Sequence, residues 1–311
     1  MKGIVTKSTG SWYTVRLENG EKVEARILGK FRMDGIKTTN PIAVGDVVTT
    51  KRDNTGTVTI SAIDARKNYI IRKSINLSKR SHIIAANIDQ AFLVVTLAQP
   101  TTYTGFIDRF LISAEAYHIP TIILFNKVDV YSEAENTRLQ ELMGIYTNIG
   151  YQCLEVSALN HTNIEQVKTL MKDKTSVVSG HSGVGKSTLL NSIEPGLDLK
   201  TSEISAMHQQ GKHTTTFAEM FELSFGGFII DTPGVKAFGL IDFDKMELSH
   251  YFLEMRERLD GCQFNNCQHI NEPKCAIKDA VAQGEIAEFR YNNYLSMYND
   301  DEEESYRDKG Y

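Results

Sequence analysis

A glycine-rich run at residues 180–188 has the spacing of a phosphate-binding loop. It follows an apolar stretch and precedes a helical pattern, which is the setting that G-x-x-x-x-G-K-[ST] requires. Backbone N–H groups and the positive end of the helix can then face an anion. We expect Lys186 to reach the β- and γ-phosphates and Ser187 to offer its hydroxyl to Mg²⁺. The predicted phosphate-binding residues are Gly180, His181, Ser182, Gly183, Val184, Gly185, Lys186, Ser187 and Thr188.

A second phosphate-side element follows about 45 residues later. The apolar residues 227–230 lead into Asp231-Thr232-Pro233-Gly234. At the end of a strand, Asp231 is expected to hold Mg²⁺ through water, and the Gly234 N–H can donate to a γ-phosphate. The D-T-P-G sequence alone is a common turn. Its position at a strand end, about 45 residues after the phosphate loop, indicates a phosphate-side element of the same nucleotide site.

Two further loops can recognise guanine. The first is the N-K-V-D sequence of Asn126, Lys127, Val128 and Asp129, which follows an apolar run. Asp129 can accept hydrogen bonds from the guanine N1–H and N2 amine, whereas adenine would leave this carboxylate without donors. Asn126 is expected to fix the loop, and the Lys127 stem to cover the ring. The second loop consists of Ser157, Ala158 and Leu159. Together the two loops predict GTP as the nucleotide.

A threonine-rich stretch between the two phosphate elements is the candidate switch. It reads G-K-H-T-T-T at residues 211–216. One threonine is expected to ligate Mg²⁺ when the γ-phosphate is present, and both Thr214 and Thr215 qualify. Val235, directly after D-T-P-G, cannot orient water, so intrinsic turnover should either be slow or rely on another group. His213 is the candidate, because an imidazole can position water. The predicted catalytic set is Lys186, Ser187, Asp231 and His213.

The motifs occur in an unusual order. The guanine loops at 126–129 and 157–159 precede the phosphate loop at 180–188. Ordinary GTPases begin with the phosphate loop, so this order indicates a circular permutation. Between residues 88 and 231, continuous apolar runs alternate with amphipathic helical patterns, which predicts a mostly parallel sheet covered on both faces. Such a sheet can bring the loops together at the carboxyl ends of its strands.

Three thiols and one imidazole fall within fourteen residues near the C-terminus. The residues are Cys262, Cys267, His269 and Cys275. Cys₃His is a closed tetrahedral set for a structural Zn²⁺. Because the protein fills all four positions, we expect one ion that stabilises a domain and takes no part in catalysis. The fourth cysteine, Cys153, lies in an apolar run and is expected in the core.

The first 64 residues read as short alternating strands. Turn signals at Gly10-Ser11 and Asn19-Gly20 separate them, and about five strands with little room for a helix predict a small closed barrel. Residues 66–80 carry six basic and no acidic side chains. We interpret this stretch as a linker that can contact a phosphate backbone. Barrel and linker together carry a charge of about +9 in a chain of net charge −5.

Length and composition exclude several classes of protein. The 311 residues predict two or three domains at roughly 100–200 residues each. The longest apolar runs, 91–95 and 122–125, are far shorter than the ~20 residues of a membrane helix. The first ten residues lack the apolar segment of a signal peptide. Four cysteines are too few for a disulfide framework, so we expect a cytoplasmic chain that binds metal.

These motifs resemble one family, the bacterial ribosome small-subunit-dependent GTPase A, whose members are circularly permuted GTPases. The resemblance covers nearly the whole chain and rests on the permuted order and the C-x4-C-x-H-x5-C spacing. It implies an OB-type barrel, hydrolysis of GTP to GDP and phosphate, and a role in late maturation of the 30S subunit. The implied partners are the 30S subunit, its 16S rRNA and GTP or GDP with Mg²⁺, with no membrane and a monomeric chain.

We therefore predict a multidomain protein. It has an OB-like β-barrel at 1–65, a circularly permuted α/β P-loop GTPase domain at 66–240 that begins with the basic linker 66–80, and a mainly helical zinc-binding domain at 241–311 that ends in an acidic tail. Two alternatives stay open. One is an RNA-binding module whose nucleotide pocket only regulates binding. The other is a P-loop ATPase or small-molecule kinase, which competition between ATP and GTP would distinguish.

Overall fold

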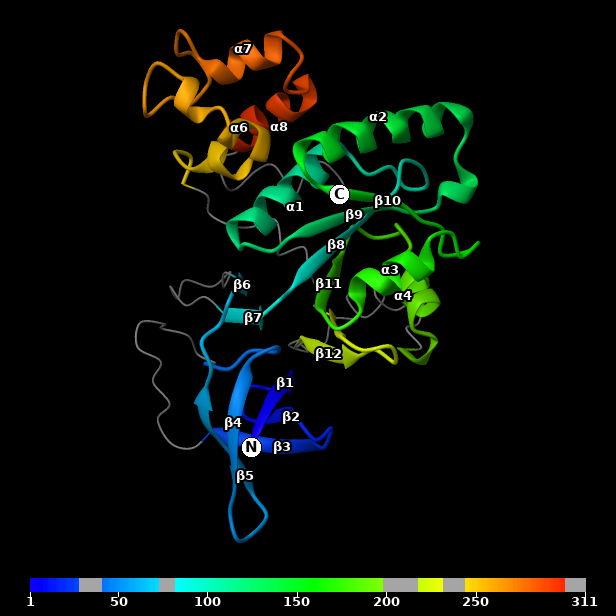
Figure 1. Ribbon diagram of the computed structural model, residues 1–311, viewed down its shortest axis with the longest axis vertical. Coiled ribbons are helices and arrows are strands. Elements are labelled where there is room, and N and C mark those ends of the chain that lie inside the picture. The colour runs from blue at the N-terminus through cyan, green and yellow to red at the C-terminus, as the bar shows by residue number, and fades with distance from the viewer. Residues whose placement is uncertain (28–40, 73–81, 198–217, 232–243, 300–311) are drawn as a thin grey trace, which may run out of the picture.

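Figure 1 shows the computed structural model, which describes residues 1–27, 41–72, 82–197, 218–231 and 244–299. A small barrel lies at one end of the molecule, a sheet with helices on both faces lies in the middle, and a small helical domain lies at the other end. None of the helices in these described ranges is both long and apolar enough to cross a membrane.

Five strands form the barrel, namely β1 Lys2–Ser8, β2 Tyr13–Leu17, β3 Lys22–Ile27, β4 Val47–Arg52 and β5 Val58–Ile63. They follow the order β1-β2-β3-β5-β4, and β4 pairs again with β1 to close the barrel. Alternate side chains point inwards, so Val5, Val15 and Ile60 are fully buried. Gly10 and Gly20 have positive φ angles at the two predicted turns. The predicted OB-like barrel is confirmed.

Six strands form the central sheet, namely β8 Gln90–Val95, β9 Thr121–Phe125, β10 Gln152–Glu155, β11 Thr175–Ser179, β12 Glu219–Glu222 and β13 Phe228–Asp231. The order β10-β9-β8-β11-β13 is parallel throughout, and β12 lies antiparallel beside β13. Strand β11 leads into the phosphate loop, and β9 leads into the N-K-V-D loop. Only β8 lies between these two strands.

Helices cover both faces of this sheet, as predicted. They are α1 Thr104–Ala116 and α2 Glu133–Ile149 on one face, and α3 Ile164–Met171 and α4 Lys186–Ile193 on the other, with 3₁₀ turns η1 Val128–Val130 and η2 Pro195–Leu197. Alternation along β8 sends Leu93 into the core under α1 and α2, and Phe92 and Val94 into the core under α3 and α4. Two apolar cores therefore hold the strand ends in fixed positions.

The barrel joins the central sheet through its first strand. Lys7 of β1 pairs with Glu219 of β12 in antiparallel register, so the barrel and the central domain share one eleven-stranded sheet. The Lys7 ammonium lies 3.2 Å from the Glu219 carboxylate, and Arg16 binds both oxygens of Glu222 at 2.5 and 2.8 Å. Because these pairs are at the surface, we expect them to contribute little to stability.

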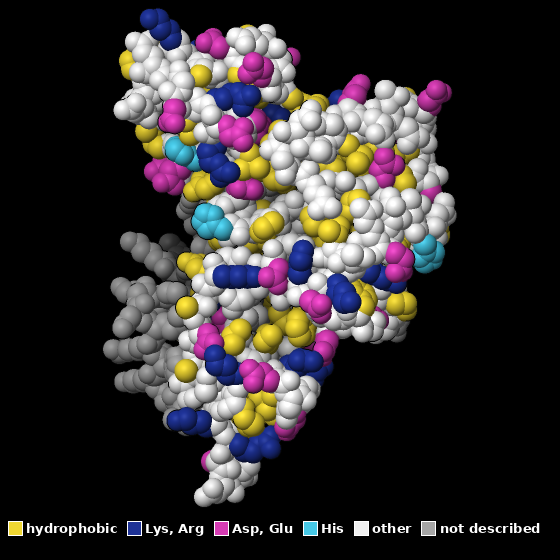
Figure 2. Space-filling model, in the orientation of Figure 1, with side chains coloured by type: hydrophobic (Ala, Val, Ile, Leu, Met, Phe, Trp, Pro, Cys, Tyr) yellow, Lys and Arg dark blue, Asp and Glu magenta, His cyan; other side chains and the backbone are white. Residues whose placement is uncertain are grey.

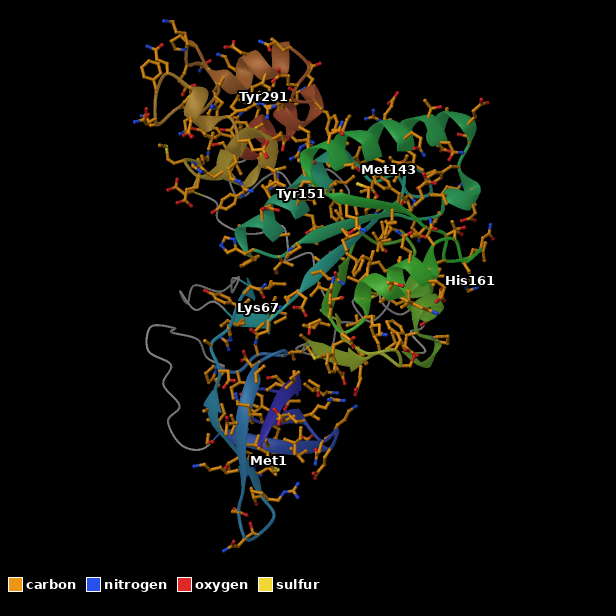
Figure 3. The ribbon with its side chains drawn as sticks, viewed as in Figure 1. Met1, Lys67, Met143, Tyr151, His161 and Tyr291 are labelled. Carbon is orange, nitrogen blue, oxygen red and sulfur yellow. The ribbon has the colours of Figure 1, made fainter. Side chains whose placement is uncertain are left out.

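The basic stretch is not a linker over its first part. Residues Tyr69–Arg72 form β6, which pairs with β7, His82–Ala86. Arg66 is buried and binds both carboxylate oxygens of Asp46 at 2.6 Å, and Lys67, labelled in Figure 3, pairs with Asp89. Asp46 neutralises Arg66 inside the protein, so Arg66 cannot contact a phosphate backbone. Residues 73–81 lie outside the described residues.

The C-terminal domain is mainly helical, as predicted. Its elements are η4 Leu248–Tyr251, α6 Leu253–Arg256, η5 Leu259–Gly261, α7 Ala276–Ala282 and α8 Glu288–Asn299. Phe252, Ile277 and Tyr294 are fully buried in its core together with two of the cysteines. In Figure 1 this domain lies over α1, and α8 contacts α1 directly. The acidic tail from residue 300 lies outside the described residues.

Candidate nucleotide and metal sites

The phosphate loop depends on its glycines. Gly180, Gly183 and Gly185 have φ angles of 149°, 85° and 89°, which residues with a side chain rarely adopt. A Cβ on Gly180 would lie 2.3 Å from the Val94 carbonyl oxygen, and one on Gly185 would lie 2.6 Å from the Asn126 side-chain nitrogen. The loop is therefore curved and packed tightly against β8 and the N-K-V-D loop.

Helix α4 begins at Lys186, directly after the last glycine. The Lys186 ammonium donates to the carbonyl oxygens of Gly180 and His181 at 2.7 Å each, which folds the side chain back across the loop. Ser187 lies in the first turn of α4 and is buried, whereas Thr188 is exposed. The N-terminus of α4 and the Lys186 ammonium together form the positive end that an anion requires.

Asn126 links the predicted guanine loops to the phosphate loop. Its buried amide donates to the Val184 carbonyl oxygen at 2.8 Å, and its oxygen accepts from the Ala158 N–H at 3.3 Å. The Ser157 hydroxyl donates to the Asp129 carboxylate at 2.5 Å. The structure therefore brings three separate loops of the sequence together at the carboxyl end of the sheet.

The predicted guanine loops carry side chains that are accessible to solvent. Asp129 is exposed, and the Leu159 side chain is 73% exposed. Lys127 has a left-handed backbone conformation with φ 65°, and its ammonium donates to the Gly183 carbonyl oxygen at 2.8 Å. Its stem therefore runs from the N-K-V-D loop to the phosphate loop, in the position expected for a side chain that covers a base.

The loop at residues 96–103, which follows β8, was not predicted to contact the phosphate loop. The Thr102 hydroxyl lies 2.6 Å from Nε2 of His181 in the phosphate loop. The Tyr131 hydroxyl accepts from the Leu97 N–H at 2.9 Å and donates to the Asn126 carbonyl oxygen at 2.7 Å. Burial raises the pKa of Tyr131 to about 12, so this donor proton is retained. The sequence feature that could have identified this loop is a mostly polar run containing Pro100 directly after the apolar residues 91–95.

Several predicted residues fall outside the described residues. The switch residues His213, Thr214 and Thr215 are among them, as is Gly234. The backbone of Asp231 ends β13, whose neighbour β11 leads into the phosphate loop, and nothing is described of its side chain. The roles of these residues stay predictions.

The four predicted metal ligands lie together. The ligand atoms of Cys262, Cys267, His269 and Cys275 are all within 4.8 Å of one another. His269 Nδ1 lies 3.5 Å from the Cys262 sulfur and 3.4 Å from the Cys275 sulfur. Zinc distances of about 2.3 Å to sulfur and about 2.0 Å to nitrogen, at tetrahedral angles, place nitrogen and sulfur about 3.5 Å apart. The cluster therefore fits a zinc site.

The electrostatics of the cluster also fit a cation. Burial raises the pKa of Cys267 to about 12 and raises that of Cys275, which disfavours thiolates in the absence of a positive charge. A bound divalent ion reverses this preference. Burial lowers the pKa of His269, so the ring is neutral and can offer a lone pair. Tyr291, labelled in Figure 3, donates to the His269 carbonyl oxygen at 2.6 Å and fixes this segment.

A phosphate loop and an N-K-x-D loop at the ends of nearby parallel strands, in this inverted chain order, define a circularly permuted P-loop GTPase. Family models agree: residues 63–241 match the RsgA GTPase model, and residues 2–60 match the RsgA N-terminal domain model. The chain belongs to the RsgA GTPase family and is a GTP-hydrolysing enzyme.

Similar proteins cover the chain almost completely. The small ribosomal subunit biogenesis GTPase RsgA of Christiangramia forsetii is 57% identical, over 99% of this chain and 98% of that protein. The protein of the same name from Flavobacterium psychrophilum is 56% identical, over 97% and 94%. Among solved structures, YjeQ from Thermotoga maritima superposes with a TM-score of 0.79, 38% identity and 96% coverage of both chains. YloQ, a circularly permuted GTPase, superposes with a TM-score of 0.75, 30% identity and coverage of 96% and 93%.

Proposed function

We propose that this enzyme hydrolyses GTP on the 30S ribosomal subunit during late maturation, and that the subunit stimulates hydrolysis. Binding of GTP is supported by the contacts of Asn126. Its side-chain amide joins the phosphate loop to both predicted guanine loops. The ribosomal half is supported by relatives that are named small ribosomal subunit biogenesis GTPases and are 57% and 56% identical. GTP, GDP and 16S rRNA are the proposed partners, and the cytoplasm is the proposed location of the chain.

Each group of the site has a proposed role. Lys186 and the loop N–H groups hold the β- and γ-phosphates, and Asp129 accepts from guanine. The Ser187 hydroxyl and Asp231 hold the Mg²⁺ that accompanies GTP, which neutralises charge on the phosphates. His213 orients the attacking water, and Thr214 or Thr215 completes the metal shell.

We also propose domain boundaries and a role for zinc. The chain divides into a barrel at 1–65, a GTPase domain at 66–240 and a zinc domain at 241–311, and it acts as a monomer. The zinc ion is structural, because its proposed ligands Cys267 and Cys275 are part of the apolar core of the C-terminal domain.

The barrel is the proposed RNA contact. Figure 2 shows basic side chains on its visible face, interspersed with acidic ones. Several basic residues are held in ion pairs, so the contact must rely on those that face solvent. Lys22, Arg26 and Lys51 are exposed. The Arg26 guanidinium lies 3.7 Å above the ring of Trp12, which is 40% exposed, and such a pair can stack on an unpaired base.

Charge reversal on the barrel should separate ribosome stimulation from basal turnover. We expect purified 30S subunits to raise the GTP turnover of the wild-type enzyme, and Arg26→Glu with Lys51→Glu to remove most of this increase while leaving the basal rate unchanged. Binding through phosphate contacts should also weaken steeply as salt rises. The measurement is phosphate release with and without subunits at two salt concentrations.

A matched control reverses charge at the other end of the molecule, at the exposed Arg256. Arg256→Glu should keep full stimulation. Equal stimulation of the wild type and the barrel variant would show that these barrel charges do not bind the subunit.

Asp129→Asn should change the base that the enzyme accepts. The amide offers a donor where the carboxylate offered only acceptors, so guanine loses its partner and xanthine gains one. We expect GTP affinity to fall about 10²-fold or more and the variant to prefer xanthosine triphosphate. Competition binding with GTP, XTP and ATP measures this.

The control for this change is Asp260→Asn, an exposed aspartate in the C-terminal domain. It should bind GTP like the wild type. If Asp129→Asn also kept the wild-type GTP affinity, Asp129 would not be the residue that reads the base.

A further inference from the structure

Helix α8 of the C-terminal domain holds the start of α1 through partly buried hydrogen bonds and one fully buried ion pair. The Asn293 amide donates to the Asp108 carboxylate at 2.5 Å and to the Thr104 hydroxyl at 3.3 Å. The Arg290 guanidinium lies 2.6 Å from the other Asp108 oxygen, and the Tyr146 hydroxyl donates to that oxygen at 2.7 Å. Asp108 and Arg290 are completely buried.

This arrangement has little freedom to shift. Arg290 also binds Glu254 of α6 through two nitrogens at 2.7 and 2.9 Å, so its charge lies between two buried carboxylates. A buried charge that loses a partner is strongly destabilising, because water cannot replace the lost interaction. The first two turns of α1 must therefore follow the position of α8.

The same end of α1 reaches the phosphate loop. Thr102 lies two residues before α1, and its hydroxyl oxygen accepts from the Thr96 N–H at 3.0 Å. The hydroxyl proton is then free to donate to Nε2 of His181 at 2.6 Å, and His181 Nδ1–H donates to the Ser182 carbonyl oxygen at 3.0 Å. Burial lowers the pKa of His181, which favours this neutral ring. Phe106 of α1 also packs edge-on against the ring, with centroids 5.5 Å apart.

We propose that Asn293 is a positioning residue for the phosphate loop, acting through Thr104 and Asp108 of α1 and the Thr102–His181 hydrogen bond. The C-terminal domain then influences nucleotide affinity from a distance. Its contacts with α1 fix the position of Thr102, and Thr102 in turn binds His181 of the phosphate loop. The inference rests on the proposed role of residues 180–188 in binding phosphates. By thermodynamic linkage, nucleotide binding must stabilise the contacts between α8 and α1 by the same free energy.

A double-mutant cycle tests this coupling. Asn293→Ala and Thr102→Val should each raise the dissociation constant of a fluorescent GDP about fivefold to tenfold, and the double variant should be no weaker than the worse single variant. Asn292→Ala changes the exposed neighbour on α8, and Thr102→Ser keeps the hydroxyl. Both should bind GDP like the wild type.

Three outcomes would overturn the proposal. They are a wild-type affinity in Asn293→Ala, a double variant whose loss equals the product of the single losses, and a loss in Asn292→Ala as large as in Asn293→Ala. Full GDP affinity in Lys186→Ala would refute the phosphate-loop assignment instead, so the two failures are distinguishable.

Hydrogen exchange gives a second readout that needs no variant in α8. Addition of GDP to the wild-type chain should slow exchange of the amides at residues 290–294, and this added protection should disappear in Thr102→Val. A purely structural role of the Asn293 contacts would leave exchange in α8 unaffected by GDP, and that result would also overturn the proposal.

Discussion

Lys186→Ala is expected to lower GTP turnover by at least about 10²–10³-fold. In the proposed mechanism, Lys186 is the cation that lies where charge develops on the transferred phosphate. Its ammonium already lies across the loop, bound to the Gly180 and His181 carbonyl oxygens. Alanine leaves those oxygens facing the phosphates with no positive charge between them. Single-turnover phosphate release, with nucleotide affinity measured in parallel, separates the loss in chemistry from the loss in binding.

The control for this variant is Lys172→Ala, which removes an exposed ammonium at the end of α3. It should hydrolyse GTP at the wild-type rate. Turnover of Lys186→Ala within a few-fold of the wild type would mean that another cation carries the charge on the phosphates.

Removal of zinc is expected to unfold the C-terminal domain selectively. Structural zinc sites contribute on the order of 10 kcal/mol of binding free energy, which exceeds the stability of a small domain. We expect one zinc ion per chain in the purified protein, and its loss in Cys267→Ser, because Cys267 is buried among the other ligands. The C-terminal domain should then melt well below the central domain. Metal analysis and thermal unfolding followed by domain-resolved hydrogen exchange measure both effects.

The matched variant is Cys153→Ser, which changes the cysteine that lies outside the cluster. It should keep the full zinc content. A Cys267→Ser protein with wild-type zinc and an unchanged melting temperature would exclude the proposed site. Because α8 belongs to the same domain, zinc loss should also weaken nucleotide binding if the Asn293 contacts act as proposed.

The positions of the phosphate loop and the two guanine loops could be predicted from the sequence because each is a short motif with its own backbone requirement, whereas the contacts of their residues with nucleotide stay predictions. Gly180 and Gly185 must adopt conformations that few other residues tolerate, and Asp129 must follow a buried strand. The permuted order was also readable, since the motifs appear in the chain in that order. The alternation of strands and helices in the central domain, and its mostly parallel sheet, followed from apolar periodicity, because both faces of the sheet are buried.

The parts that were missed depend on partners far away in the chain. Arg66 belongs to a run without acidic residues, and its neutralising partner Asp46 lies twenty residues earlier. The Thr102–His181 bond joins residues 79 positions apart, and Asn293 meets Asp108 across 185 positions. No local pattern encodes such contacts, because they arise only once β8, β11 and the C-terminal domain have packed.

The strand order has a consequence for synthesis of the chain. From β8, the sheet grows outwards through β9 and β10, then β11 adds to the free edge of β8, and the β12–β13 pair adds to β11. Each strand that leaves the ribosome can therefore join an edge that is already exposed, and none has to insert between two paired strands. Synthesis proceeds at about 5–20 residues per second, so the half that carries the two predicted guanine loops is synthesised roughly 1–4 s before the phosphate loop appears. GTP can stabilise the nascent protein only after that point.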